Sequence, residues 1–502
     1  MRGWLLLIFS LLCSLTTRGQ VFPDLVLQQF YDNLGEERPT CIIRDREGFL
    51  YLGGNSVIPD EMEPDCANIW LVKVDAQGEI YWEQEVRLGG CEELRDMVPS
   101  QDGGVVFVGV TGSIVNGEEQ GSEEYGGNYF AGKIDSVGQL EWIQSYGGSQ
   151  LDQAYALAEG PYREFMLVGS THSNDGQVDD HIGMSDLWTL KVDTRGQPRF
   201  SQVLGSAGND WGTSVALTQE GDYLIAGYTQ RKVKSKEEGQ GWVLRMTPSG
   251  EILWDTVLYQ PYGGYITEIK ETPRGNIAAV GYRLNEKGDR DFWWTLLDDQ
   301  GKMLWQHSMD GPNQERLTSL DLTADGGLIL GGYAEPLLQG EGDYVKGGED
   351  FWLLRTDSLG RLMWRKTYGG REDERCTGVV AYAPGVYYAI GEKVNRFTRG
   401  SHQANLDYWF LRVEERAKAD IEASIFVRAN DFRIDRLQPT RFRAITNYGD
   451  RFLWDFGDGT TSDEAEPLKT YQISGTYEVT LTIFVNDHCQ RTVTLERVLE
   501  VW

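Results

Sequence analysis

A short aromatic motif that recurs along the chain constrains the fold more than any other feature of the sequence. The motif begins with a polar residue and ends with an aromatic one, and its copies lie 51 to 60 residues apart. The aromatic residues of the seven copies are Trp70, Phe130, Trp188, Trp242, Trp293, Trp352 and Trp409. A repeat of this length indicates either a solenoid or a closed, ring-shaped repeat protein.

A second aromatic residue decides between these two architectures. In six copies it follows the first by twelve residues, at Trp82, Trp142, Phe200, Trp254, Trp305 and Trp364. In the seventh copy this position falls on Ile421, where the repeat has ended. Phe30, however, stands five residues before Gly35, just as Trp364 stands five residues before Gly369. We therefore expect an N-terminal strand to complete the last repeat and close a ring, which a solenoid does not need.

Each repeat contains four segments of strand character. In the sixth copy they are Arg316–Asp325, Gly327–Tyr333, Phe351–Asp357 and Arg361–Gly369. Short turns that contain Gly join the first segment to the second and the third to the fourth, which is typical of β-hairpins. The sequence thus predicts an all-β fold, a seven-bladed β-propeller closed by an N-terminal strand, over residues 20–416.

The first 19 residues have the build of a secretory signal peptide. One Arg precedes an apolar run from Trp4 to Leu15, and small and polar residues follow. No later segment is long and apolar enough for a membrane-spanning helix, so we expect an exported protein in the periplasm, at the cell surface or outside the cell. The 77 acidic and 47 basic residues give a net charge of -30, which makes nucleic acid an unsuitable partner.

Two resemblances accompany these patterns. The repeat, best seen in Gly169–Asp193, is similar to that of repeat propellers in exported bacterial surface proteins, a likeness that implies an architecture but no activity. In residues 417–502 the stretch Trp454–Gly459 resembles the signature of the PKD domain, which implies an immunoglobulin-like β-sandwich that acts as a spacer or contacts proteins or glycans. Asp455 and Asp458 are either cation ligands or, as we favour, turn residues that bind backbone N–H groups.

The loops between the second and third strands of each repeat are long and variable, so we expect a binding site on the face that they form. Their candidate binding residues are Glu123, Tyr125, Asp175, Asp179, Asp180 and Asp343. Such oxygen-rich loops suit Ca²⁺, but no EF-hand spacing is present. Solvated, charge-rich loops are therefore the stronger interpretation.

A second candidate set stands at the start of the first strand of several repeats, near the predicted channel mouth. It consists of Asp152, Asp210, Glu315 and Glu374. These carboxylates can attract a cation or a basic group, or they can bond to the backbone of a neighbouring blade. We favour the structural role, because catalysis needs residues with different roles. Trp211 lies near the loop face and is not part of the aromatic repeat. We expect the Trp residues of the repeat to pack between blades.

Five cysteines remain after removal of a signal peptide, an odd number in a compartment that permits disulfides. Cys41 and Cys376 both begin first strands, in repeats that a closed ring makes neighbours. Cys66 and Cys91 fall on one face of the first repeat. The sequence suggests the bridges Cys41–Cys376 and Cys66–Cys91, with buried free thiols as the alternative.

No zinc, nucleophile-elbow or phosphate-loop motif occurs in the chain. We therefore expect a secreted, non-enzymatic binding or scaffolding protein of the bacterial cell envelope or surface, with no cofactor, or with Ca²⁺. Its protein or glycan partner would contact the loop face and the PKD module. The alternative is a carbohydrate-active hydrolase or lyase with its site at the channel mouth.

Overall fold

The computed structural model describes most of the chain beyond residue 20. The described ranges are 21–33, 35–57, 67–88, 91–111, 127–231, 239–311, 314–335, 348–370, 372–395, 405–417, 421, 423–427, 432–446, 448–449, 451–486 and 489–502. The predicted signal peptide and Cys66 lie outside them. The chain divides into two compact units, Pro23–Glu414 and a second unit that contains Glu415–Trp502. Throughout the described ranges the secondary structure is β-strand, without a helix.

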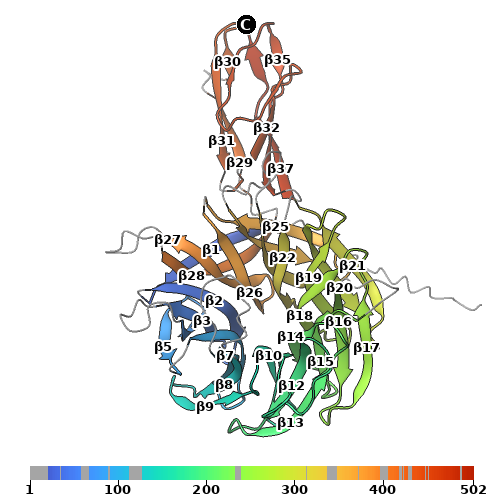
Figure 1. Ribbon diagram of the computed structural model, residues 1–502. Helices are drawn as coiled ribbons and strands as arrows, with labels where there is room; N and C mark the ends of the chain where they lie inside the picture. Colours follow the sequence, from blue (N-terminus) through green and yellow to red (C-terminus); the bar gives the residue numbers. More distant parts are fainter. Residues whose placement is uncertain are drawn as a thin grey trace, which may run out of the picture. The chain divides into compact units, whose positions relative to one another are not determined.

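The described part of the unit Pro23–Glu414 contains seven four-stranded sheets (Figure 1). The first three are β2 (Glu36–Arg44), β3 (Leu50–Val57), β4 (Asn68–Val74) and β5 (Ile80–Val86); β6 (Glu92–Pro99), β7 (Val105–Thr111), β8 (Asn128–Ile134) and β9 (Leu140–Tyr146); and β10 (Asp152–Glu159), β11 (Phe165–Thr171), β12 (Asp186–Val192) and β13 (Pro198–Leu204). The next two are β14 (Asp210–Leu217), β15 (Tyr223–Thr229), β16 (Gln240–Met246) and β17 (Ile252–Leu258); and β18 (Gly264–Glu271), β19 (Ile277–Leu284), β20 (Arg290–Leu297) and β21 (Met303–Met309). The last two are β22 (Glu315–Leu322), β23 (Leu328–Ala334), β24 (Asp350–Thr356) and β25 (Leu362–Tyr368); and β26 (Glu374–Ala383), β27 (Val386–Asn395), β28 (Asn405–Ala417) and β1 (Val21–Tyr31).

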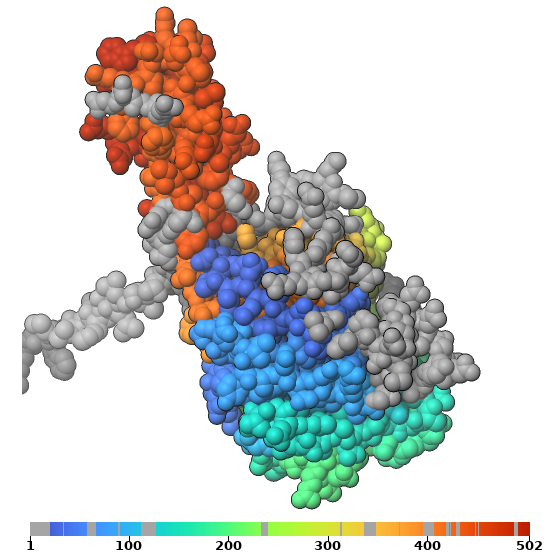
Figure 2. Space-filling view, turned by 90° about the vertical axis from the view of Figure 1, so that its left-hand side faces the viewer, coloured from blue at the N-terminus to red at the C-terminus, as the bar shows by residue number. Residues whose placement is uncertain are grey.

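Consecutive sheets contact one another through their first strands, which gives a propeller-like arrangement. Strand β6 contacts β2 and β10, and the same relation continues through β14, β18, β22 and β26. Because β26 also contacts β2, the series closes on itself. The N-terminal strand β1 lies beside β28 in the last sheet, where the ring of Phe30 stacks on Trp409 at 6.3 Å. In Figure 2 the blue surface of the first strands borders the orange of the strands that end this unit.

Short hairpins join the third and fourth strands of the sheets, and their side chains explain the turns. Asp357 Oδ1 accepts hydrogen bonds from the backbone N–H of Leu359 (2.8 Å) and Arg361 (2.9 Å). Gly360 then adopts φ 74°, a left-handed conformation that favours glycine. The carboxylate thus fixes the turn and the glycine permits it.

The repeated aromatic residues pack between adjacent sheets. Trp188 of β12 is fully buried and lies 4.4 Å, between ring centroids, from Tyr129 of the preceding sheet. The Tyr129 hydroxyl also donates a hydrogen bond to the Trp188 carbonyl at 3.1 Å. Burying such large side chains is a main source of stability for stacked sheets.

The second unit contains three small sheets. Its strands are β29 (Ala423–Val427), β31 (Thr440–Thr446) and β34 (Leu468–Lys469); β30 (Arg433–Ile434), β38 (Leu499–Val501) and β35 (Gly475–Tyr477); and β33 (Thr461–Ser462), β32 (Arg451–Asp455), β36 (Thr480–Asn486) and β37 (Cys489–Thr494). Trp454 is buried in their common core. Asp455 accepts from the Gly457 N–H (2.9 Å), and Asp458 from the Thr460 N–H (3.1 Å). Lys469 Nζ lies 2.6 Å from Asp458 Oδ2, so both aspartates have the bonds of turn residues.

Candidate functional site

The repeated carboxylates occupy the first position of the innermost strands. Asp152, Asp210, Glu315 and Glu374 open β10, β14, β22 and β26, and each is at most 1% exposed. Glu37 in β2 and Glu92 at the start of β6 are buried in the same way. Sequence reasoning missed these two because the residues before them depart from the usual spacing after a Gly step.

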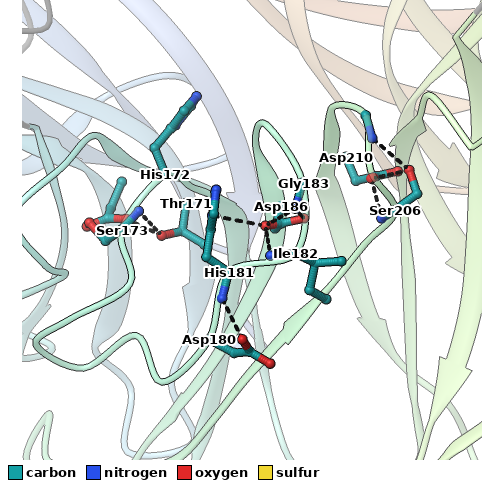
Figure 3. A network of polar contacts seen from close by, with 12 residues as sticks. Thr171, His172, Ser173, Asp180, His181, Ile182, Gly183, Asp186, Ser206 and Asp210 are labelled. Carbon is teal, nitrogen blue, oxygen red and sulfur yellow. Dashed lines mark hydrogen bonds and ion pairs between the residues drawn. The ribbon is translucent and has the colours of Figure 1, made fainter.

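Hydrogen bonds hold these carboxylates to the connection that precedes each strand (Figure 3). Asp210 Oδ2 accepts from the backbone N–H of Ser206 at 2.6 Å and from its hydroxyl at 2.7 Å, and Asp210 Oδ1 accepts from Thr229. Asp152 Oδ2 similarly accepts from the Gly148 N–H (2.8 Å) and the Ser173 hydroxyl (3.0 Å). These bonds fasten the link between consecutive sheets, which supports the structural role for the ring.

Glu374 is held in the same way, and a lysine side chain lies beside it. Its Oε2 accepts from the Gly370 N–H at 2.9 Å, and Lys393 Nζ lies 3.6 Å from Oε1. Burial raises the pKa of Glu374, while the Gly370 N–H and Lys393 act in the opposite direction. Burial likewise raises the pKa of Asp152. Neither group is directed at open solvent, so neither resembles a general acid poised for a substrate.

A second set of buried acids faces this ring and was not identified from sequence. Asp186, Asp291, Asp350 and Asp407 lie within the first three residues of the third strands, each at most 2% exposed. Asp186 and Asp210 converge on Gly205, where an added Cβ would lie 2.5 Å from Asp186 Oδ1 and 3.2 Å from Asp210 Oδ2. A signal was present in the sequence, because each of these aspartates stands two residues before a repeated Trp.

The loop that carries Asp175, Asp179 and Asp180 is pinned to the scaffold at its first half. Asp175 Oδ1 accepts from the Ser149 N–H at 2.6 Å. Gln177 donates its backbone N–H to the Gly147 carbonyl (3.2 Å), and its Oε1 accepts from the Gly147 N–H (3.0 Å). Asp175 is thus a positioning residue rather than a free ligand.

The second half of this loop presents a mixed acidic and apolar edge. Val178 is buried in the core, while the next two residues, Asp179 and Asp180, are exposed. Ile182 is 47% and Met184 65% exposed. His181 Nδ1 lies 3.2 Å from Asp186 Oδ2, and the backbone N–H groups of Ile182 and Gly183 also donate to that carboxylate (Figure 3). The edge is therefore held in place by a buried aspartate beneath it.

Trp211 does not form an open aromatic platform. Its ring stacks on Tyr228 at 4.2 Å between centroids, with 16° between the planes. Its indole Nε1 donates to the Tyr265 hydroxyl at 3.2 Å, and Tyr265 stacks in turn on Tyr282 at 5.3 Å. These half-buried rings join the fourth and fifth sheets, so packing already occupies the indole.

A cavity of about 420 Å³ is lined by the seven innermost strands. Three of its carboxylates accept hydrogen bonds from the next sheet around the ring. Glu268 Oε2 accepts from the Leu320 N–H (2.6 Å), and Asp321 Oδ2 from the Ala381 N–H (2.8 Å). Asp96 Oδ2 accepts from the Leu157 N–H (3.1 Å). Sequence reasoning did not single out these residues.

The structure corrects one predicted disulfide. Cys41 and Cys376 are free thiols: Cys41 packs in the core shared with the second sheet, whereas Cys376 faces Gly331 of the sixth sheet. The two side chains therefore enter different interfaces. Cys91 is disulfide-bonded, but its predicted partner Cys66 lies outside the described residues, as do the candidate binding residues Glu123, Tyr125 and Asp343.

Comparison with known proteins identifies the C-terminal module. The family model of the PKD domain matches residues 429–499. No curated protein matches the chain. Among the described residues, no helix has the length and apolar character needed to cross a membrane.

Several solved structures are similar at low identity. The extracellular domain of a B. thetaiotaomicron protein classed with hybrid two-component systems is 11% identical, with a TM-score of 0.40, and the match covers 95% of this chain and 60% of that one. The WD40 domain of Neurospora crassa Pan2 is 11% identical, with coverage of 78% and 96% and a TM-score of 0.46. The Fusarium graminearum α-L-arabinofuranosidase Arb93A is 11% identical, with coverage of 78% and 98% and a TM-score of 0.39. The chain spans less than two thirds of the first of these, and at such scores we draw no function from them.

Proposed function

We propose that this chain is an exported binding protein of the cell envelope or surface, in which a seven-bladed propeller closed by β1 presents a partner-binding loop face. The single observation that carries the proposal is the edge Asp179–Met184. There, exposed carboxylates and exposed apolar side chains lie together on a loop that buried residues hold in one conformation. A pre-ordered edge of this kind loses little entropy on binding.

The chemistry of the edge favours a protein partner that offers basic and apolar side chains. Two adjacent aspartates attract a basic group, and the -30 net charge of the chain extends that attraction over a longer range. Ile182 and Met184 provide apolar area beside the charges, and Met adapts readily to a partner surface. The PKD domain is a second module suited to contacts outside the cell.

A glycan-cleaving activity is the second candidate, and the described residues favour it less. Glycosidases need two carboxyl groups with different roles on either side of a substrate. Asp210 and Glu374 instead repeat one role, since each accepts bonds from the connection before its own strand. We therefore place recognition rather than turnover at this face.

The test compares the mature protein with loop variants in binding experiments on envelope proteins and glycans of the native host. We expect Asp179→Asn/Asp180→Asn and Met184→Ala each to weaken partner binding at least tenfold. Tyr162→Ala is the control, because Tyr162 is 79% exposed in a turn between first and second strands. Partner binding that tolerates both loop variants, or turnover of a glycan that Glu374→Gln abolishes, would contradict the proposal.

A further inference from the structure

Three carboxylates meet where the ring of sheets closes. Asp32 belongs to the link between β1 and β2, Glu37 to β2 of the first sheet, and Asp407 to β28 of the last sheet. One ligand atom from each lies within 4.8 Å of the others. The cluster thus joins the β1–β2 link and the start of β2 to β28, at the position where the first and last sheets of the ring meet.

Glu37, a member of this cluster, has an oxygen without a hydrogen-bond partner. Its side chain is fully buried, and its Oε1 accepts from the Gly35 N–H (2.9 Å) and the Ser56 hydroxyl (3.2 Å). Its Oε2 is buried without a hydrogen-bond partner. A buried carboxylate oxygen that has lost water and gained no donor is costly, so this atom indicates a missing ligand.

Two other buried acids of the ring have a cation beside them. Lys393 pairs in register with Glu374 and lies 3.6 Å from it. Arg283 Nε lies 3.4 Å from Asp291 Oδ2. The residue in register with Glu37 is Ser56, which carries no charge. At the closing junction a third carboxylate, Asp32, lies near Glu37 and Asp407. The residue opposite Glu37 in the sheet supplies only a hydroxyl group.

We propose that Asp32, Glu37 and Asp407 bind a divalent cation of the Ca²⁺ class. All three ligands are carboxylate oxygens, which suit hard cations and not the His or Cys sites that Zn²⁺ prefers. Asp32 is exposed, so a cation can enter from solvent and keep water ligands there.

The cation would stabilise the contact between the first and last sheets, where the ring closes. It would attach the β1–β2 link to both β2 and β28, and so oppose release of the N-terminal strand from the last sheet. Sites in extracellular modules bind Ca²⁺ with dissociation constants of about 0.1–1 mM. At saturating Ca²⁺ the folded state gains stability by mass action.

The experiment measures Ca²⁺ binding to the chelator-treated full chain by titration calorimetry and counts bound ions by native mass spectrometry. We expect Asp32→Asn and Glu37→Gln each to bind one Ca²⁺ fewer than the wild type, and to lose part of the rise in Tm that Ca²⁺ causes. Glu36→Gln is the matched control, because Glu36 is the adjacent, exposed glutamate and pairs with Arg38.

The number of Ca²⁺ ions bound by each variant distinguishes this site from other acidic surfaces. Because Asp32 is exposed, Asp32→Asn tests the site even where Glu37→Gln folds poorly. The proposal is overturned if Asp32→Asn binds as many Ca²⁺ ions as wild type and Glu36→Gln, with an unchanged rise in Tm. It is also overturned if Zn²⁺ displaces Ca²⁺ at this site or if Mg²⁺ alone occupies it.

Discussion

Lys270 in the central cavity is the most informative residue to remove. Its Nζ lies 3.1 Å from Asp321 Oδ1 and 3.3 Å from Glu268 Oε1, and it donates to the Leu320 carbonyl at 2.8 Å. Burial lowers the pKa of Lys270, but the two carboxylates outweigh this effect and raise it overall. The ammonium group is therefore charged at neutral pH, and its stabilising contribution is lost only at a pH above its ordinary value.

The cost of Lys270→Met can be bounded from the exposure of the three groups. Removing one partner of a fully buried ion pair costs about 3–5 kcal/mol, whereas an exposed pair contributes about 0–1 kcal/mol. The Lys270 side chain is 33% exposed, and those of Glu268 and Asp321 are 24% exposed. We therefore expect a loss of about 2 kcal/mol. With an unfolding entropy of about 2.1 cal/mol/K per residue, a unit of this size loses roughly 2–3 °C in Tm.

Scanning calorimetry and denaturant unfolding of the full chain measure this loss. Lys287→Met is the control, because it removes the same charge from an exposed position in a turn, and we expect it to stay within about 0.5 kcal/mol of the wild type. Lys270→Arg keeps the charge and should recover part of the stability. If Lys270→Met costs no more than Lys287→Met, the cavity network does not stabilise the ring and our reasoning fails.

Two further predictions concern the cavity and the closure. Burial raises the pKa of Asp96 to about 7, against the N–H groups of Leu157 and Met97. The folded state then holds the proton of Asp96 more tightly than the unfolded chain does. Wild-type stability therefore falls as the pH rises from about 4 to 7. The variant Asp96→Asn should be more stable than wild type by up to about 3 kcal/mol between pH 5 and 8. At the closure, Tyr31 is 4% exposed and donates to the Gly78 carbonyl at 2.7 Å, so Tyr31→Ala should cost about 3–5 kcal/mol, measured by denaturant unfolding. Phe30→Ala should cost only about 1 kcal/mol, because that ring is 40% exposed; equal costs would contradict the packing described for β1.

The aromatic spacing predicted the sheets because one residue per repeat must fill the same gap between neighbours. Trp188 and Trp352 could be recognised without coordinates, since a position that packs between sheets tolerates little change in size. Phe30 was recognisable for the same reason, as the aromatic residue that the last copy lacked. A repeated packing requirement is thus visible in a single sequence.

The charged residues of the cavity were not predictable, because the innermost strands break their own alternation. In β18 the register shifts between Ile266 and Glu268, and β22 shifts between Leu317 and Ser319. A β-bulge reverses the face on which later side chains lie. A prediction that assumes strict alternation of faces therefore puts Lys270 and Asp321 on the wrong face of their strands. No turn residue or Gly marks the shift in these strands.

Glu37 and Asp32 were missed for a different reason. At the sixth junction Glu374 follows Gly370 by four positions, whereas at the closure Glu37 follows Gly35 by only two. The shorter link removes the spacing by which the other acids were found. Asp32, which lies in this link, is close to Glu37 and Asp407.

These differences bear on where activity can reside in a repeated architecture. The acids that recur, such as Asp210 and Glu374, are buried and accept hydrogen bonds from the links between sheets, so their negative charge is not available to a partner. Other acids behave differently: Asp179 and Asp180 are exposed on an ordered edge, and Asp32 brings a third carboxylate to Glu37 and Asp407 at the closing junction. Repetition at equivalent positions is what ring assembly requires, whereas recognition needs a site that differs from its neighbours. The third sheet's loop and the closing junction differ from their counterparts in this way, and experiments on function should begin there.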